Sequence, residues 1–455
     1  MTTLWAAQAL TASGWRRDMR VTVDASGMIT AVEPGAPRTG DHVSDILLPA
    51  PANAHSHAFQ RAMAGLTERR GPDPRDTFWT WRQLMFRFLD RLTPDQVEAI
   101  AAFVQMEMLE AGYATNVEFH YLHHRPGGEP YDNVAEMAER IAAAAAQSGI
   151  GLTLLPVLYQ YGGCDRRALG AGQIRFGNDP DRFARLHAAS AGALKGLPSD
   201  CRIGVAPHSL RAVAPEAIAG LFALAPGGPI HMHLAEQVAE VEEVLANLGR
   251  RPVEWVMDHL DPDARCTFIH CTQMAPHETE ALARSGAIAG LCPITESSLG
   301  DGIFDAVRWF ENGGRIAVGS DSNIRIALSE ELRTLEYSQR LRDRSRAALA
   351  TPEMSTGRRL FEAAARGGAM AAGRPTGVIG VGMLADLLAL GGAHVDLDGR
   401  TGDTLLDTFI FAGDDGMVCD VWSAGRHMVR CGHHVARDGI IANYRKALKD
   451  LGESI

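Results

Sequence analysis

The 455-residue sequence lacks the features that mark a membrane protein or a nucleic-acid-binding protein. It contains no apolar run of about 18 residues, and its N-terminal segment has no basic stretch followed by a long apolar one. Lysine is scarce, with three residues, no block of Lys and Arg stands out, and the formal net charge is −11. Such a chain offers no electrostatic footprint for nucleic acid or for an anionic membrane. We therefore expect a cytoplasmic protein whose partner is a small molecule.

The cysteines do not form a recognisable framework either. There are seven of them, an odd number, with no CxxC pair, and a large intracellular chain has little need of disulfides. We expect them to be reduced. Low-complexity linkers and repeats with a period of roughly 20 to 50 residues are also missing. The 46% of hydrophobic and 22% of charged residues are an ordinary globular balance, with ample apolar material for a core.

Short apolar runs alternate with longer Ala-, Leu-, Glu- and Arg-rich stretches from about residue 47 onwards. This alternation is typical of βα units around a parallel sheet. Eight strands close a (β/α)8 TIM barrel, and eight runs are present: DILLPAPANAHSH, ATNVEFHY, GLTLLPVLY, CRIGVAPHS, GPIHMHLAE, CTFIHC, GAIAGLCPI and RIAVGSDS. We predict an α/β fold with a barrel over residues 49–373.

Both ends of the chain have a different pattern. Residues 1–48 contain short β-like runs, such as Met19 to Val23 and Met28 to Val32, between Gly, Asp and Pro turn signals. The β-type pattern returns in residues 374–455, in the segments ADLLAL, DTFIFAG and VCDVWSAGRHMVR. We predict that the two ends pair into one small discontinuous β-sandwich domain beside the barrel.

Almost every one of the eight runs ends in a polar residue that could take part in catalysis. In a β/α barrel the carboxyl ends of the strands build the active site. We therefore expect these residues to converge on one face: His55 and His57, His120 and Tyr121, Tyr159, His208, His233, His270, Pro293 to Glu296, and Asp321.

Two His-x-His pairs occur, one at His55 and His57 and one at His231 and His233. Side chains two residues apart lie on the same side of a strand, so both histidines of a pair can reach one metal. Either pair alone is weak evidence. The run His233-Leu-Ala-Glu236 favours His233 over His231, because it places a carboxylate just past the ligand. His231 is expected to pack or to support the barrel interior.

Residues farther along the chain strengthen the case for the first pair. His233, His270 and Asp321 end the fifth, sixth and eighth predicted strands. A buried cluster of imidazoles and carboxylates is costly unless a cation or a proton network satisfies it. Together with His55 and His57, these residues predict a metal site at the barrel mouth.

The same residues and their order resemble the amidohydrolase superfamily, over nearly the whole chain. Six segments are similar to the branch of that superfamily that hydrolyses N-formimino-L-glutamate to N-formyl-L-glutamate and ammonia in histidine degradation. They are HSHAFQRAMAGL, TFWTWR, FHYLHH, APHSLRAV, HLAEQ and CPITESSLGDG. The resemblance implies a zinc-dependent deiminase, with a homodimer as the usual assembly.

Many members of this superfamily hold two metals bridged by a carboxylated lysine near strand 4. Here Lys195 is the sole lysine before residue 446, and it falls in a polar loop upstream of that strand. We therefore expect one metal per subunit, bound by His55, His57, His233 and Asp321. The resemblance implies zinc, although imidazole and carboxylate ligands also suit iron or manganese.

The expected chemistry derives from such a site. Zinc lowers the pKa of a bound water from ~15.7 to about 7. Asp321 can then accept the water proton, His270 can orient or stabilise the attacking oxygen, and Glu236 can pass a proton to the departing nitrogen. The alternative for Glu236 is a solvated carboxylate in the first turn of a helix, stabilised by the helix dipole.

The two carboxylates of the implied substrate call for arginine, which binds carboxylates with two parallel hydrogen bonds. Arg211 follows strand 4, and Arg82 lies after strand 1 near Phe78, Trp79 and Trp81; both match the substrate clamp of the resembled enzymes. Arg75 and Arg87 are alternatives to Arg82, and the aromatic stretch could equally pack under a lid. The remaining substrate-binding residues carried over from the resemblance are Gln60, Tyr121 and His208.

Two other functions fit the sequence less well. A related deaminase of a guanine-like or cytosine-like ring would favour stacking aromatics and amide side chains, whereas Arg211 suits an anion. The H-x-E and P-C-x-x-C zinc pattern of the unrelated nucleoside deaminases is absent from the sequence. A catalytically inactive barrel that serves in assembly would have lost metal ligands, and this chain keeps them.

Overall fold

The computed structural model describes residues 1–69 and 78–452 and contains a parallel β/α barrel. Two sheet segments form it, β5 to β8 and β10 to β13, and β9 pairs with β7. The isolated bridges Ser56 to Asp321 and Val205 to Ile230 close the ring. The strands are β5 (Ala52–Ser56), β6 (Thr115–His120), β7 (Gly151–Leu158), β8 (Arg202–Ile203), β9 (Ala206–Pro207), β10 (Ile230–Leu234), β11 (Cys266–His270), β12 (Ile288–Leu291) and β13 (Arg315–Val318).

All eight predicted strand positions are therefore occupied, and the predicted amidohydrolase-type barrel is confirmed. The fourth position is split into β8 and β9, on either side of Gly204. A Cβ atom at Gly204 would lie 2.4 Å from the carbonyl oxygen of Pro229, so only glycine permits this close approach of the next strand. The interruption lies between the two short strands that lead to His208.

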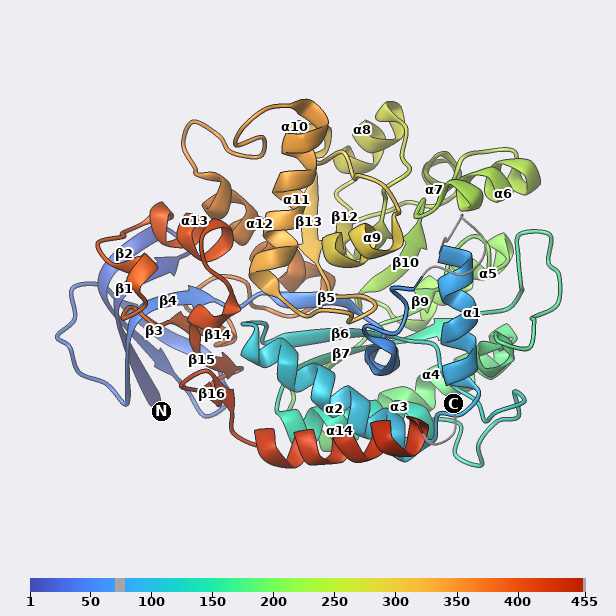
Figure 1. Ribbon diagram of the computed structural model, residues 1–455, viewed down its shortest axis with the longest axis horizontal. Helices are drawn as coiled ribbons and strands as arrows, with labels where there is room; N and C mark the ends of the chain where they lie inside the picture. The colour runs from blue at the N-terminus through green and yellow to red at the C-terminus, as the bar shows by residue number, and fades with distance from the viewer. Residues whose placement is uncertain (70–77, 453–455) are drawn as a thin grey trace.

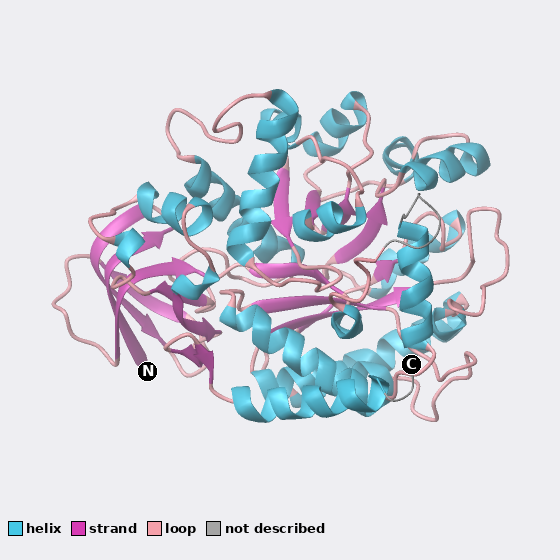
Figure 2. Cartoon of the chain, in the orientation of Figure 1, coloured by secondary structure: helices cyan, strands magenta, loops and turns pink. Residues whose placement is uncertain are grey.

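Helices surround the strands (Figure 2). Several of them begin with a proline directly after the N-cap residue. The fixed φ of proline suits the first turn of a helix. The helices between the first and the last strand of the barrel are α1 (Phe78–Leu89), α2 (Pro94–Glu110), α3 (Glu136–Ser148), α4 (Pro180–Ala193), α5 (Pro215–Leu224), α6 (Val238–Leu248), α7 (Pro252–His259), α8 (Pro276–Arg284), α9 (Pro293–Leu299) and α10 (Ala306–Glu311). Beyond β13 the chain forms α11 (Leu328–Asp343) and α12 (Thr356–Ala371).

The two chain ends build one β-sheet at the side of the barrel (Figure 1). The sequence predicts a sandwich here, and the structure places all eight strands on one hydrogen-bonded path, because β14 pairs with both β4 and β15. In spatial order they are β17 (His433–His434), β16 (Arg426–Arg430), β15 (Val418–Ser423), β14 (Leu387–Leu390), β4 (His42–Pro49), β1 (Thr2–Thr11), β2 (Gly14–Val23) and β3 (Ile29–Glu33). The exact domain limits at 48/49 and 373/374 stay predictions.

The prediction of a β-type segment at DTFIFAG was wrong. Most of it lies in helix α13 (Asp403–Phe411), which packs against α11 and α12. Leu405, Leu406, Phe409 and Ile410 are buried, at the spacing of one helix face. The short run DTFIFAG contains only part of this pattern and does not reveal the helical period. The last helix of the described residues is α14 (Arg437–Gly452), which lies along α2 (Figure 1).

A buried ion network joins the barrel to the sheet. Arg374 binds Asp200 at 2.7 Å and Asp386 at 3.0 Å, and Arg426 binds Asp200 at 2.9 Å. The side chain of Arg374 is completely buried. Because a buried guanidinium is stable only with hydrogen-bonded counter-charges, these pairs hold β14 and β16 of the sheet against the barrel.

The structure also bears on the expectations about the cysteines and about membrane-spanning helices. All seven cysteines are free thiols in the structure. Among the described residues, no helix combines the length and the apolar character needed to cross a membrane.

Candidate active site

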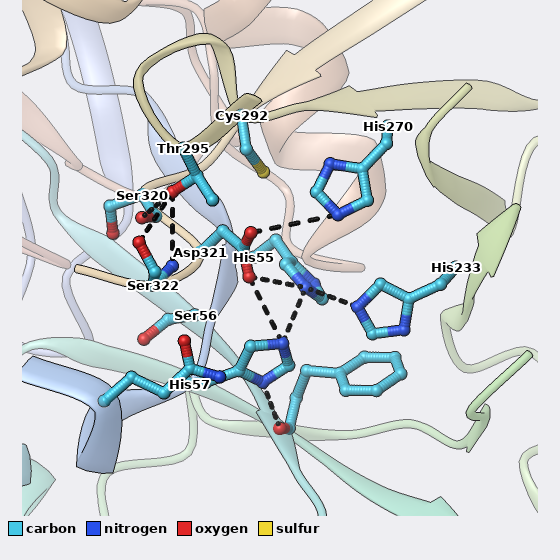
Figure 3. A network of polar contacts seen from close by, with 12 residues as sticks. His55, Ser56, His57, His233, His270, Cys292, Thr295, Ser320, Asp321 and Ser322 are labelled. Carbon is cyan, nitrogen blue, oxygen red and sulfur yellow. Dashed lines mark hydrogen bonds and ion pairs between the residues drawn. The ribbon is translucent and has the colours of Figure 1, made fainter. Parts of the chain in front are cut away.

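Three histidines from two strands meet at the carboxyl end of the barrel. His55 Nε2 lies 3.2 Å from His57 Nε2 and 3.2 Å from His233 Nε2. Asp321 Oδ1 lies 3.2 Å from His57 Nε2 and 3.5 Å from His55 Nε2. All four residues are buried, and Figure 3 shows their side chains pointing toward one another. The four residues predicted as metal ligands therefore converge on one point.

The hydrogen bonds of two of these rings show which nitrogen faces that point. His57 Nδ1 donates to the carbonyl oxygen of Phe119 at 3.1 Å, and His233 Nδ1 donates to that of His208 at 3.0 Å. A carbonyl oxygen can only accept, so the proton is on Nδ1 and the Nε2 lone pair points into the cluster. Burial lowers the pKa of His57 to about 3 and those of His55 and His233 well below the usual value, so the rings stay neutral.

This donor set fits a metal ion. Converging lone pairs on neutral imidazoles, with a carboxylate oxygen beside them, repel one another unless a cation lies between them. Three nitrogens and one oxygen match the set of ligand atoms that zinc prefers, and carbonyl groups bound to Nδ1 are the usual orienting partners of metal-binding histidines. His231 lies apart from this cluster: its Nε2 donates to the carbonyl oxygen of Ala371 at 2.8 Å.

A second group of potential ligands adjoins the first. His270, Cys292 and Asp321 also place ligand atoms within 4.8 Å of one another. However, burial and the neighbouring carboxylates of Asp321 and Glu296 raise the pKa of the Cys292 thiol well above its usual value. A protonated thiol is a poor metal ligand, because the thiolate is the form that binds. The histidine cluster is the better metal site.

The backbone holds Asp321 in an unusual conformation. Its φ is +47°, in the left-handed region that residues other than glycine rarely adopt. Main-chain hydrogen bonds fix it to the first strand, from Asp321 N to His55 O at 2.9 Å and from His57 N to Asp321 O at 3.0 Å. Asn323 Nδ2 donates to the carbonyl oxygens of Asp321 and His57, each at 3.1 Å. Strain of this kind persists where surrounding contacts enforce it, as at functional sites.

His270 lies among three carboxylates. Its Nε2 is 3.8 Å from Glu236 Oε1 and 3.8 Å from Asp321 Oδ2, and its Nδ1 is 3.3 Å from Glu296 Oε1. Burial opposes a charge on the ring, but Glu236, Glu296 and Asp321 outweigh it and raise the pKa of His270 to about 10. Burial, reinforced by Glu236 and Glu296, raises the pKa of Asp321 to about 7 against the opposing effect of His270. The site thus combines a cationic imidazole with a carboxylate that can take up a proton near neutral pH.

Glu236 is not the solvated helix-start carboxylate of the alternative interpretation. It lies before α6, is 5% exposed and lines the pocket. Arg211 Nη2 is 3.6 Å from its Oε2, and Glu240, behind it, accepts hydrogen bonds from the main-chain N–H groups of Ala235 and Glu236 at 3.0 Å each. These contacts hold the carboxylate of Glu236 toward His270.

The predicted substrate-binding residues line the same pocket. Gln60 Nε2 donates to the hydroxyl of Tyr121 at 2.9 Å, and Arg82 Nη2 donates to that of Tyr159 at 2.9 Å. Arg87 on the same helix is exposed, and Arg75 lies outside the described residues. The predicted site residues on the pocket wall are His57, Gln60, Arg82, Tyr121, His208, Arg211, His233, Glu236, His270 and Asp321, and His55 touches two of them from behind.

The sequence pattern assigns no role to Glu296 or Tyr159. Both lie among the polar strand ends, and Glu296 also lies within the segment CPITESSLGDG, which is the signal that points to them. Trp81 also lines the pocket, with Met85, Phe176 and Leu299. Nothing is described of the side chains of Phe78 and Trp79.

A β/α barrel with an attached β-sheet and a buried histidine cluster at the strand ends defines an amidohydrolase-type metal site. The model of the "Amidohydrolase family" matches residues 46–428, and that of "Formimidoylglutamate deiminase HutF, N-terminal domain" matches residues 1–43. The chain belongs to the amidohydrolase family and, within it, to the formimidoylglutamate deiminases. The resemblance found in the sequence is confirmed.

Individual relatives agree with this assignment. "Formimidoylglutamate deiminase" of Pseudomonas aeruginosa is 44% identical over 454 residues, which cover 99% of this chain and 100% of that protein. The crystal structure of an amidohydrolase from Brucella melitensis has a TM-score of 0.95 and 47% identity, covering 99% of this chain and 100% of that one. An adenosine deaminase from Xanthomonas campestris with bound zinc has a TM-score of 0.81 at 21% identity, covering 99% of this chain and 98% of that one, and shares the fold.

Proposed function

We propose that this chain hydrolyses N-formimino-L-glutamate to N-formyl-L-glutamate and ammonia, as a step of histidine degradation. The observation that carries the proposal is the full-length similarity to a formimidoylglutamate deiminase, over a chain whose candidate ligands, acids and arginines all meet in one pocket. A formimino group is an amidine and is usually cationic. Glu236 and Asp321 on the pocket wall give it a complementary electrostatic environment.

We propose one zinc ion per subunit, held by His55, His57, His233 and Asp321. When bound there, zinc would lower the pKa of water and make hydroxide available at neutral pH. The Nδ1 protons of His57 and His233 are fixed on the side away from the cluster, so their Nε2 atoms are free to bind an ion. An ion held by the histidines and Asp321 takes the carboxylate of the second group and leaves there only His270 and Cys292, which supports a single ion. Structural relatives with bound zinc point to the same metal.

The chain's own residues then handle protons and charge. Asp321 takes a proton from the attacking water, whose oxygen forms a bond to the formimino carbon. His270 stabilises the negative charge that develops on this oxygen, because its pKa of about 10 keeps the ring cationic. The remaining proton of this oxygen passes through Glu236, 3.8 Å from His270, to the terminal nitrogen; the C–N bond breaks, the C=O bond forms, and ammonia leaves.

The substrate's two carboxylates require donors on the opposite side of the pocket. We propose Arg82, Arg211, Gln60, Tyr121 and His208 for this role. Arginine supplies paired donors in the geometry of a carboxylate, and both arginines lie on the pocket wall. We further propose a cytoplasmic homodimer, whose assembly state can be measured by sedimentation.

Incubation of the zinc-loaded protein with N-formimino-L-glutamate tests the function directly. We expect release of ammonia and of N-formyl-L-glutamate, and a loss of at least about 100-fold in Asp321→Asn, the range typical of a catalytic acid or base. Guanine and cytosine serve as competing substrates. Turnover of either ring instead, or no ammonia from protein with bound zinc, would contradict the proposal.

A further inference from the structure

We propose that Tyr159 is a substrate-binding residue that donates its hydroxyl proton to a carboxylate of the substrate. The inference rests on the proposed function and adds a specificity-determining group to the site. Tyr159 directly follows β7 and is 3% exposed. Its ring contacts that of His208, with the centroids 4.5 Å apart, and that of Phe176 at 5.6 Å. The hydroxyl-bearing side chain lines the pocket on the side of α1, which stands across the ends of β6 and β7 in Figure 1.

The hydroxyl oxygen accepts two hydrogen bonds. Arg82 Nη2 donates to it at 2.9 Å and Gln173 Nε2 at 2.8 Å. A guanidinium and an amide NH2 group have no lone pair to offer, so neither can accept the proton of Tyr159. With both acceptor positions of the oxygen occupied, the O–H bond must point away from Arg82 and Gln173.

The orientation of Gln173 is fixed by the main chain. Gly170 N donates to Gln173 Oε1 at 3.0 Å, and Gln173 N donates to the carbonyl oxygen of Gly170 at 2.8 Å. This pair assigns the amide oxygen to the turn and leaves the NH2 group toward Tyr159. Gln173 is therefore a positioning residue, since it acts on the substrate through the hydroxyl of Tyr159.

The direction left to the proton leads into the pocket. Among the described residues no acceptor for this hydroxyl lies within hydrogen-bond distance, and the pocket is the open space that the residue faces. The adjacent guanidinium of Arg82 draws electron density from the oxygen and makes the O–H a stronger donor. An anion placed there would meet the hydroxyl beside a positive charge, which is the environment a carboxylate requires.

Steady-state kinetics of Tyr159→Phe test the inference, because phenylalanine keeps the ring contacts and removes only the hydroxyl. We expect the KM for N-formimino-L-glutamate to rise about 10- to 100-fold, the range of a hydrogen bond to a charged group, with kcat changed less than about threefold. Tyr161→Phe is the matched control, since Tyr161 lines a separate surface pocket. Zinc content should match the wild type in both variants, and the melting temperature should match it in Tyr161→Phe and fall slightly in Tyr159→Phe, because Arg82 and Gln173 lose this acceptor.

Two substrate analogues identify the carboxylate. N-formimino-γ-aminobutyrate lacks the α-carboxylate, and N-formimino-L-2-aminobutyrate lacks the γ-carboxylate. The effect of Tyr159→Phe should disappear with the analogue whose missing group is the partner of Tyr159. An equal loss with all three compounds, or an unchanged KM, would overturn the inference.

The role of Gln173 is tested by a double-mutant cycle. Gln173→Met should raise the KM by a few-fold, and Tyr159→Phe combined with Gln173→Met should behave as Tyr159→Phe alone, because the two residues act through one hydroxyl. Additive effects would refute the positioning role. If the wild type turns over N-formimino-L-glutamate and Tyr159→Phe keeps the same KM, only the role of Tyr159 is overturned. If the zinc-loaded wild type is inactive, the proposed function is overturned as well.

Discussion

His270 and Glu296 are joined on the side of the ring that faces away from the histidine cluster: Nδ1 of His270 lies 3.3 Å from Oε1 of Glu296. The same oxygen accepts a hydrogen bond from Cys292 N at 2.8 Å, so the main chain at the start of α9 fixes the position of the carboxylate. The contact orients Nε2 of His270 toward Glu236 and Asp321. Glu296, to which the sequence pattern assigns no role, thereby sets the orientation of a proposed catalytic group.

Replacement of Glu296 by glutamine should therefore reduce kcat about 10-fold, because a charged hydrogen bond to His270 becomes a neutral one. The KM and the zinc content should stay within about twofold of the wild type, since Glu296 is not among the proposed ligands or clamp residues. Steady-state kinetics and metal analysis measure both. Glu311→Gln, an exposed carboxylate, is the control. An unchanged kcat would show that His270 needs no such partner.

Removal of the metal should abolish ammonia release and lower the melting temperature. A ligand whose free concentration is about 1,000 times its Kd stabilises the folded state by roughly 4 kcal/mol. Chelation removes this contribution and leaves the imidazole lone pairs facing one another without a cation between them. Added zinc should restore both activity and stability. His233→Ala should not recover on zinc addition, whereas His277→Ala, which changes an exposed histidine, should recover fully. A melting temperature that is indifferent to chelation would contradict the assigned site.

Substitution of Gly319 by alanine should disturb the metal site without changing any ligand. A Cβ atom at this position would lie 2.5 Å from His55 N and 2.8 Å from His55 O, so β13 and β5 must move apart. Forced overpacking of this kind costs about 1–3 kcal/mol. We expect a lower melting temperature and a lower zinc affinity, measured by thermal unfolding and metal titration.

The matched control is Gly220→Ala in helix α5, where a Cβ atom meets no atom within 4 Å. Alanine there should be neutral or stabilise the helix by roughly 0.5–1 kcal/mol, because it restricts the unfolded chain more than glycine does. Equal zinc affinities in the Gly319 and Gly220 variants would show that the approach of β13 to β5 is not required.

The buried ion network predicts a pH dependence of stability. Burial opposes ionisation of Asp200, but Arg426 and Arg374 outweigh it and hold its pKa at about 2, below the usual 3.8. A depressed carboxyl pKa stabilises the folded protein above the unfolded-state pKa, and this stability is lost as pH falls from about 4 to about 2. The contribution at neutral pH is about 2 kcal/mol.

Chemical unfolding at several pH values checks this. The stability difference between the wild type and Asp200→Asn should be large at pH 7 and should shrink by about 2 kcal/mol below pH 4. Asp398→Asn, an exposed carboxylate, should show no such change in the same series. A difference that stays constant down to pH 2 would mean that Asp200 titrates normally in the folded state.

Much of this molecule was predictable because barrel strands are buried on both faces and read as short apolar runs. The turns that follow the strands are polar, so the sequence alone predicts functional residues at the strand ends. They are His55, His57, His233, His270 and Asp321. The segment in α13 shows the limit of this reasoning: a run of a few apolar residues has too few positions to separate a period of 2 from one of 3.6. Arg374, fully buried among aspartates from distant segments, had no local pattern at all.

The sequence by itself determined the family, the eight strands and the ligand types, because these depend on local hydrophobic periodicity and on motifs read along the chain. Only the tertiary structure decided which atoms meet. The tautomers of His57 and His233, the contact of Glu296 with His270, and the direction of the Tyr159 hydroxyl all depend on partners far away in the sequence. Hydrogen bonds are short and directional, so they are set only when the folded backbone brings these groups together.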